Sequence, residues 1–454
     1  MIHESVSSLD NAKSVDDLVY TAVFSSDAAA KGEARRQIHL RARQAGAVPS
    51  SIYDLYQAIG RGEVTRKFTV PAFNIRALTY DVARALFRAA MKHNVGPFIF
   101  EIARSEIGYT EQRPGEYAAC VLGAALAEGY KGPVFIQGDH FQASAKKWAT
   151  EEGKAAEVKA LESLIDEAIA AEFYNIDIDT STLVDLSFPT RDEQQRTNYT
   201  YTAHFTQYIR ARQPQGIQIS IGGEIGEVGK YNTQPDEVRA YIDGVRRALG
   251  GDPGMAKISV QTGTSHGGVP MADGSIAEAK IDFDVLRETT RICREEYRVA
   301  GSVQHGASTL PETVFNKFPE SDAVEIHLAT GFQNMILDAE TLPASMKDEI
   351  RQFCFDNCAD ERKDGETDEQ FVYKTRKKAI GPFKRRMWEL DAATKGPIIE
   401  AIEKKFEFLL EKLAVYDTRD LVDRYISTNA ALPEYAAASA ELTAAATVDP
   451  NEGE

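Results

Sequence analysis

Hydrophobic and polar positions follow two different periods along the chain. After Gly62, short apolar runs alternate with longer segments whose apolar residues recur every three or four positions, as in YDVARALFRAAMKH. The short runs have the length of buried strands, and the periodic segments have the spacing of amphipathic helices. Eight strands are predicted, at residues 68–74, 97–103, 133–139, 173–179, 217–224, 257–263, 301–305 and 323–329.

Strands that alternate with helices in this way predict an α/β fold with a parallel sheet. Near-continuous apolar strands are typical of sheets that helices cover on their outer side. Eight strand–helix units within residues 63–343 match the size of a closed (β/α)8 TIM barrel. A doubly wound open sheet is the competing layout. The segment after the first strand, PAFNIRALTYD, lacks the glycine fingerprint G-x-G-x-x-G expected of that layout.

The segments on either side of the barrel carry the helical period without strands. We expect residues 1–62 to form an N-terminal helical extension and residues 344–430 a C-terminal helical extension. Residues 431–454 are small, polar and acidic, which predicts a flexible tail. The barrel, residues 63–343, is therefore the predicted catalytic domain.

Charge and composition narrow the range of partners. The 454 residues carry a formal net charge of -17, which argues against nucleic acid and anionic membrane surfaces, because these attract lysine and arginine. No apolar run approaches the roughly 18 residues of a membrane span, and the N-terminus lacks the basic and apolar blocks of a signal peptide. We expect a cytoplasmic protein that acts on a small molecule.

Ionisable residues gather where the predicted strands end. His140, His266 and His305 lie at or just past three of these ends, and Asp179 and Glu224 close two others. One histidine alone is more often a hydrogen-bonded structural residue, but barrel closure would bring all five to the rim where chemistry collects. Burying them together without a cation would be costly, so the pattern predicts a metal site.

Three imidazoles with an open fourth position favour Zn²⁺ as the metal, with another divalent cation as the alternative. Asp179 and Glu224 would be alternative ligands or hydrogen-bond partners of the histidines. Asp139, next to His140, is the predicted proton carrier, because both side chains can approach one metal where the strand bends. Glycine-containing segments at 265–270 and 304–309 predict backbone nests for a phosphate.

Six motifs, taken in order, resemble the class II, zinc-dependent ketose-bisphosphate aldolases of the fructose- and tagatose-bisphosphate type. They are VPAFN, GDH, IDIDTS, GGEIGEVG, TGTSHGG and QHGAST, and they span roughly residues 66–335. The resemblance implies that His140, His266 and His305 hold the zinc and that Asp139 transfers a proton. It places Asp179 and Glu224 at an alternative, more buried metal position.

The resemblance also implies the substrate contacts and the reaction. Substrate and phosphate contacts are expected at Asn74, Gly267, Gly268, Gly306, Ala307, Ser308, His327 and Thr330. In this family a monovalent cation, Na⁺ or K⁺, often accompanies the phosphate. The implied reaction is reversible aldol cleavage of a phosphorylated ketose, such as a fructose or tagatose bisphosphate, to two three-carbon products via a zinc-stabilised enediolate. It belongs to carbohydrate metabolism, such as glycolysis, and we expect a homo-oligomer, a dimer or tetramer.

Further glutamates are candidates for a second proton transfer, and a lysine would be needed for a metal-free route. Glu227, in the loop after the fifth strand, is the candidate for a second proton-transferring carboxylate, ahead of Glu237. A class I aldolase would need a lysine inside the barrel. Lys257 is the only lysine in a predicted strand, but it opens that strand and is therefore expected at the opposite rim.

Two departures from the family pattern leave the substrate open. The eighth strand reads EIHLATG where relatives carry Lys-x-Asn-x-Asp-Thr, so that only Thr330 is kept. Ala103 stands where relatives often have a phosphate-binding serine, with Arg104 or Ser105 as candidate replacements. Two alternatives therefore stay beside the aldolase: a metal-dependent sugar-phosphate isomerase or epimerase or an aldolase with an altered substrate, and a non-catalytic stabilising subunit of another aldolase.

Overall fold

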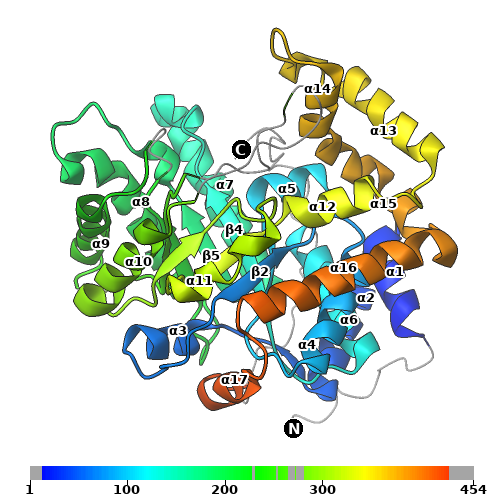
Figure 1. Ribbon diagram of the computed structural model, residues 1–454, viewed down its shortest axis with the longest axis horizontal. Coiled ribbons are helices and arrows are strands. Elements are labelled where there is room, and N and C mark those ends of the chain that lie inside the picture. Colours follow the sequence, from blue (N-terminus) through cyan, green and yellow to red (C-terminus); the bar gives the residue numbers. More distant parts are fainter. Residues whose placement is uncertain (1–12, 227–230, 252–253, 264–270, 272–280, 429–454) are drawn as a thin grey trace.

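Eight parallel strands surround the centre of the protein in the computed structural model (Figure 1). The structure describes residues 13–226, 231–251, 254–263, 271 and 281–428. Each predicted strand overlaps one observed strand, so all eight are confirmed. The strands are β2 (Val70–Asn74), β3 (Ile99–Ala103), β4 (Gly132–Gln142), β5 (Asn175–Asp179), β6 (Ser220–Glu224), β7 (Lys257–Ser259), β8 (Ser302–Gln304) and β9 (Glu325–Leu328).

The pairing of the strands closes the sheet into a barrel. The strand order runs β4-β3-β2-β9-β8-β7-β6-β5, and β4 pairs with β5 as well. All of these pairings are parallel. An open sheet would leave two unpaired edges, so the predicted (β/α)8 barrel is confirmed and the doubly wound alternative is wrong.

Helices cover the outside of the barrel, and their apolar spacing explains why. In α4 (Thr79–Lys92), Val82, Leu86 and Phe87 recur at helical spacing and are fully buried. Arg88 of the same helix pairs with Glu403 of α16 (Ala392–Lys412). The covering helices of the barrel also include α6 (Pro114–Glu128), α7 (Glu151–Ala170), α8 (Arg191–Arg212), α9 (Pro235–Ala248), α10 (Phe283–Ile292) and α12 (Thr330–Leu337).

The N-terminal extension is helical except for one short strand. It contains α1 (Val15–Phe24), α2 (Ala28–Ala45) and α3 (Tyr53–Gly60), with β1 (Ala47–Pro49) between the last two. β1 pairs in parallel with the first residues of β4, Ala47 lying opposite Gly132. The Ile52 N–H then donates to Asn175 Oδ1 at the start of β5. Three residues are too few to show a strand period, which is why the sequence predicted helix alone here.

The C-terminal extension is helical, as predicted. It contains α13 (Ala344–Asn357), α14 (Asp368–Thr375), α15 (Ile380–Trp388), α16 (Ala392–Lys412) and α17 (Arg419–Tyr425), and α16 packs along α4 (Figure 1). The predicted tail at 431–454 lies outside the described residues. None of the described helices combines the length and the apolar character that a membrane span requires.

Candidate metal centre

β4 carries a bulge at the residues that the sequence placed at its end. The strand continues to Gln142, and its register with β5 shifts between Gly138 and Phe141. His140 has a φ of 39°, a left-handed conformation that is uncommon for a residue other than glycine. On a regular strand neighbouring side chains point to opposite faces, whereas a bulge redirects one of them. Asp139 and His140 therefore both line the same pocket.

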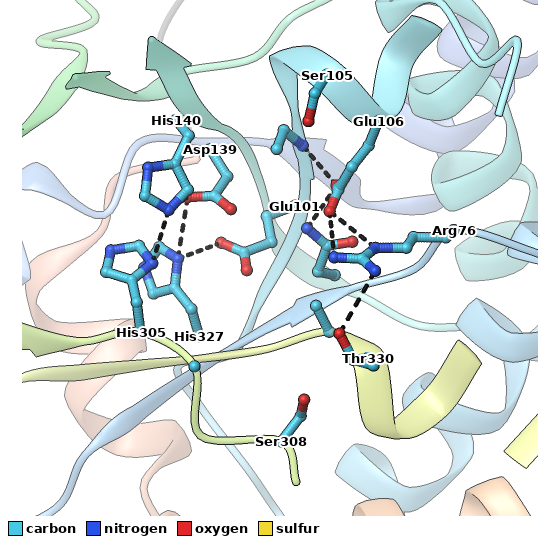
Figure 2. Close-up of a pocket in the computed structure, with 14 residues that line it drawn as sticks. Arg76, Glu101, Ser105, Glu106, Asp139, His140, His305, Ser308, His327 and Thr330 are labelled. Carbon is cyan, nitrogen blue, oxygen red and sulfur yellow. Dashed lines mark hydrogen bonds and ion pairs between the residues drawn. The ribbon is translucent and has the colours of Figure 1, made fainter. Parts of the chain in front are cut away.

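Two histidines on different strands face each other in this pocket. His140 Nε2 lies 3.0 Å from His305 Nδ1 (Figure 2). The outer nitrogens of both rings have partners: His140 Nδ1 lies 2.9 Å from Asp179 Oδ2 and 3.1 Å from Glu224 Oε2, and His305 Nε2 lies 2.9 Å from Ser259 Oγ. Metal-bound imidazoles are commonly held in this way, with the outer N–H donated and the inner nitrogen left for the ion.

The charges around His140 favour a cation. Burial lowers the pKa of His140, but the carboxylates of Asp139 and Glu224 outweigh it and raise that pKa well above its usual value. Burial raises the pKa of Glu224 to about 7, and the charge of Asp179 adds to this effect. Burial also opposes ionisation of Asp179, yet hydrogen bonds, above all from His140, lower its pKa. A positive charge next to His140 therefore stabilises the ionised forms of the surrounding carboxylates.

The donor atoms fit a divalent transition metal. One ligand atom from each of Asp139, His140 and His305 lies within 4.8 Å of the others, and His140, Asp179 and Glu224 form an overlapping set. Imidazole and carboxylate donors suit Zn²⁺, and the hydrogen bonds at the outer nitrogens orient both rings toward one point. The structure thus brings together four of the five predicted ligands. The fifth, His266, lies outside the described residues.

Asp139 connects this centre to a second buried cluster around His327 of β9. His327 Nδ1 lies 3.1 Å from Asp139 Oδ1 and 3.0 Å from Glu101 Oε2, and its Nε2 lies 2.7 Å from Glu325 Oε1. The sequence reading missed Glu101 and did not connect Glu325 with the metal site. The available signal was a glutamate within an otherwise apolar strand, in FEIA and in VEIHL.

Lys257 lies inside the barrel, whereas the sequence predicts it at the opposite rim. Its ammonium donates to Asp177 Oδ2 at 2.9 Å, to Gln137 Oε1 at 2.8 Å and to Glu325. Burial lowers the pKa of Lys257, but the charges of Asp177 and Glu325 outweigh it and raise that pKa above its usual value. A lysine that keeps its proton is not a nucleophile, which argues against a class I route.

Lys257→Met is expected to destabilise the fold by about 3–5 kcal/mol, because it leaves Asp177 and Glu325 buried without their cation. Urea unfolding followed by circular dichroism measures this loss. Lys404→Met is the matched control, since Lys404 and its partner Glu400 are exposed, and no measurable change is expected. Equal midpoints for Lys257→Met and the wild type would contradict the structural role of Lys257.

Most of the described residues with predicted substrate contacts meet in the same pocket. Its lining includes Asn74, Gly306, Ser308, His327 and Thr330, together with Asp139, His140 and His305. Ala307 is fully buried and is not among the described lining residues. Gly267, Gly268 and Glu227 lie outside the described residues. Glu237 is engaged elsewhere, accepting from the Gln234 N–H at 2.9 Å at the start of α9.

The sequence reading missed a buried ion pair at one end of the pocket. Arg76 Nε lies 2.8 Å from Glu106 Oε1 (Figure 2). The other oxygen of Glu106 accepts from Asn74 Nδ2 at 2.6 Å. The Ala103 N–H also donates to Glu106, at 2.7 Å. Because Glu106 belongs to a short helix, α5 (Arg104–Tyr109), that leaves β3 at once, no strand pattern pointed to it.

The two candidate replacements for the family's serine lie in different places. Ser105 lines the pocket. Arg104 instead forms a buried ion pair with Glu157 of α7 and is not among the described lining residues.

Comparisons with known proteins give one family and several similar folds. The family model described as "Fructose-bisphosphate aldolase class-II" matches residues 61–393. A sequence comparison with curated proteins gives no match.

Several solved structures are similar to this chain. A probable tagatose 6 phosphate kinase from Sinorhizobium meliloti 1021 is 15% identical with a TM-score of 0.50, over 79% of this chain and 91% of that one. The fructose-bisphosphate aldolase of Campylobacter jejuni is 17% identical with a TM-score of 0.46, over 82% and 96%. The YdjI aldolase of Escherichia coli K12 is 15% identical with a TM-score of 0.40, over 76% and 99%. At identities this low the structural matches concern the fold alone.

Proposed function

Because the chain belongs to the class II fructose-bisphosphate aldolase family, we propose that it is a zinc-dependent lyase that reversibly cleaves a phosphorylated ketose into two three-carbon products. The observation that carries the proposal is the facing pair of nitrogens, His140 Nε2 and His305 Nδ1, 3.0 Å apart beside Asp139. A Zn²⁺ ion bound there, with His266 as the third imidazole, would polarise the substrate carbonyl and stabilise the enediolate that cleavage produces.

Proton transfer is the part of the reaction that we assign to carboxylates of the chain. Cleavage removes the proton of the hydroxyl next to the breaking C–C bond, and the carbon that keeps the bonding electrons is then protonated. We assign that second transfer to Asp139, whose Oδ1 lies 3.9 Å from His140 Nε2. Glu227 is our proposal for the first transfer.

Phosphate binding is assigned to the segment after β8 and the first turn of α12. Gly306, Ser308 and Thr330 line the pocket. Gly306 has a φ of 67°, and a residue in this left-handed conformation helps adjacent backbone N–H groups to face an anion. The Gly331 N–H donates to Ser308 Oγ at 3.1 Å, which holds the segment against the start of α12. The N-terminus of that helix also favours an anion. Gly267 and Gly268 would complete this site, with Na⁺ or K⁺ beside the phosphate.

A substrate panel tests the proposed function. The purified full chain, loaded with Zn²⁺, is incubated with fructose and tagatose bisphosphates and monophosphates while triose release is followed. We expect release with at least one ketose, loss of activity with EDTA, and recovery with added Zn²⁺. An isomeric sugar without triose release would instead support the isomerase or epimerase. Bound zinc without turnover of any ketose would favour the stabilising subunit.

A further inference from the structure

Three donor atoms from β3, β4 and β9 converge beside the proposed zinc site. His327 Nδ1 lies 3.0 Å from Glu101 Oε2 and 3.1 Å from Asp139 Oδ1, and one ligand atom from each of the three residues lies within 4.8 Å of the other two. Two ligands that hold one ion at about 2.1 Å are separated by about 3.0–3.4 Å, the edge of an octahedron or tetrahedron. The two contacts of His327 therefore have the spacing of ligands that share an ion.

Glu101 gives an independent sign of a ligand at this point. Its side chain is 0% exposed, and its Oε1 has no hydrogen-bond partner among the described residues. The side chain extends from β3 toward His327 and lines the pocket (Figure 2). Gln137 Nε2 donates to the other oxygen, Oε2, at 3.0 Å and so orients the carboxylate. A buried carboxylate oxygen without a partner is unfavourable, and a cation held by both oxygens of Glu101 would satisfy Oε1.

His327 is already held in the orientation that a metal ligand needs. Its Nε2 lies 2.7 Å from Glu325 Oε1, and Glu325 also pairs with Lys257. Ligating imidazoles commonly donate the outer N–H to a carboxylate, which leaves the other nitrogen's lone pair for the metal. With that tautomer, Nδ1 would direct a lone pair at Glu101 and Asp139. That lone pair and the two carboxylates would repel one another. A cation between the three groups would replace the repulsion with coordination.

A neighbouring set of donors is less suitable. Asp177, Glu325 and His327 also present three close donor atoms. The ammonium of Lys257 already serves the two carboxylates of that set, at 2.9 Å from Asp177 Oδ2 and in contact with Glu325. The positive charge needed there is thus supplied by the protein, whereas no lysine or arginine among the described residues forms an ion pair with Glu101 in the structure.

We propose that Glu101, Asp139 and His327 bind a second divalent cation, of a kind that accepts one imidazole and two carboxylates, such as Zn²⁺ or Mn²⁺. This ion would lie next to the first, because the ring centroids of His305 and His327 are 4.1 Å apart and Asp139 belongs to both donor sets. The inference goes beyond the proposed function, since binding of the second ion requires no aldol chemistry.

Direct counting of bound metal tests the second site. The full chain is saturated with Zn²⁺ or Mn²⁺, freed of excess ion and examined by native mass spectrometry and elemental analysis. We expect two ions per chain in the wild type. Glu101→Gln and His327→Asn should each lose one ion and keep the other. Glu106→Gln is the matched control and should keep both ions. It removes a buried carboxylate of the same pocket that belongs to neither donor set.

A spectroscopic measurement keeps the test valid if a variant does not fold. Two neighbouring Mn²⁺ ions in the wild type should give a magnetically coupled electron paramagnetic resonance spectrum, and Glu101→Gln should give that of an isolated ion. A single uncoupled ion in saturated wild type would overturn the proposal and point to a protonated imidazole between the carboxylates. Two ions that persist in both variants would overturn it as well. Two ions without aldol cleavage would contradict the proposed function alone.

Discussion

His305→Ala is expected to lower kcat/KM for ketose cleavage by about 1,000-fold or more and to remove the ion held with His140. His305 Nδ1 is one of the two facing nitrogens, 3.0 Å from His140 Nε2. Without it, the ion would keep His140 but lose the second imidazole ligand. A Lewis-acid metal contributes several kcal/mol of transition-state stabilisation, and about 4 kcal/mol corresponds to a factor of about 1,000. Steady-state kinetics and zinc content at a buffered free Zn²⁺ concentration measure the two effects.

Ser259→Ala provides the graded comparison for this variant. Ser259 Oγ contacts the outer nitrogen of His305 at 2.9 Å and does not approach the ion itself in our assignment. Loss of such an orienting partner typically weakens metal binding or activity by about 10- to 100-fold. Added Zn²⁺ should therefore rescue Ser259→Ala more completely than His305→Ala. Full zinc occupancy and activity in His305→Ala would contradict its assignment as a ligand.

Asp139→Asn is expected to lower kcat by about 100- to 10,000-fold, the range of general acid–base catalysis, while the ion at His140 and His305 stays bound. The asparagine keeps the shape of the side chain but cannot carry the proton. The more specific measurement is exchange of solvent deuterium into the triose product. The exchange is followed at the carbon that cleavage of the ketose leaves as a carbanion. This exchange should disappear in the variant.

The neighbouring carboxylate distinguishes proton transfer by Asp139 from a general effect of lost charge. Glu101→Gln removes a charge on the other side of His327 Nδ1 but keeps Asp139 in place. Exchange should persist in Glu101→Gln, even if its rate changes with the loss of the second ion. Undiminished exchange in Asp139→Asn would remove Asp139 from its proposed role.

The strands and the gathering of His140 and His305 with carboxylates at one rim could be predicted because their signals are local. A run such as PVFIQGD is apolar along its whole length, and only burial on both faces explains that composition. Parallel strands in a barrel place their carboxyl ends on one rim, so residues at those ends become neighbours without any knowledge of side-chain geometry. His140, His305, Asp179 and Glu224 meet for this reason.

Contacts between distant side chains could not be predicted in the same way. Glu101 and His327 meet across strands that are 226 positions apart in the chain, a contact that depends on which way each side chain turns inside the barrel. The pair Arg76–Glu106 joins the segment after β2 to α5, and Lys257 reaches Glu325 through its long side chain. No period in the sequence encodes such pairings, because they depend on the distances that closure sets.

The sequence by itself determined the closed barrel, the helical extensions and the clustering of His140 and His305 with carboxylates at one rim. Those features depend on hydrophobic period and strand order, which act along the chain. Only the tertiary structure decided that a bulge turns Asp139 and His140 toward one pocket and that His327 joins Asp139 to Glu101. These arrangements arise from packing and charge pairing between strands that touch only once the barrel has closed.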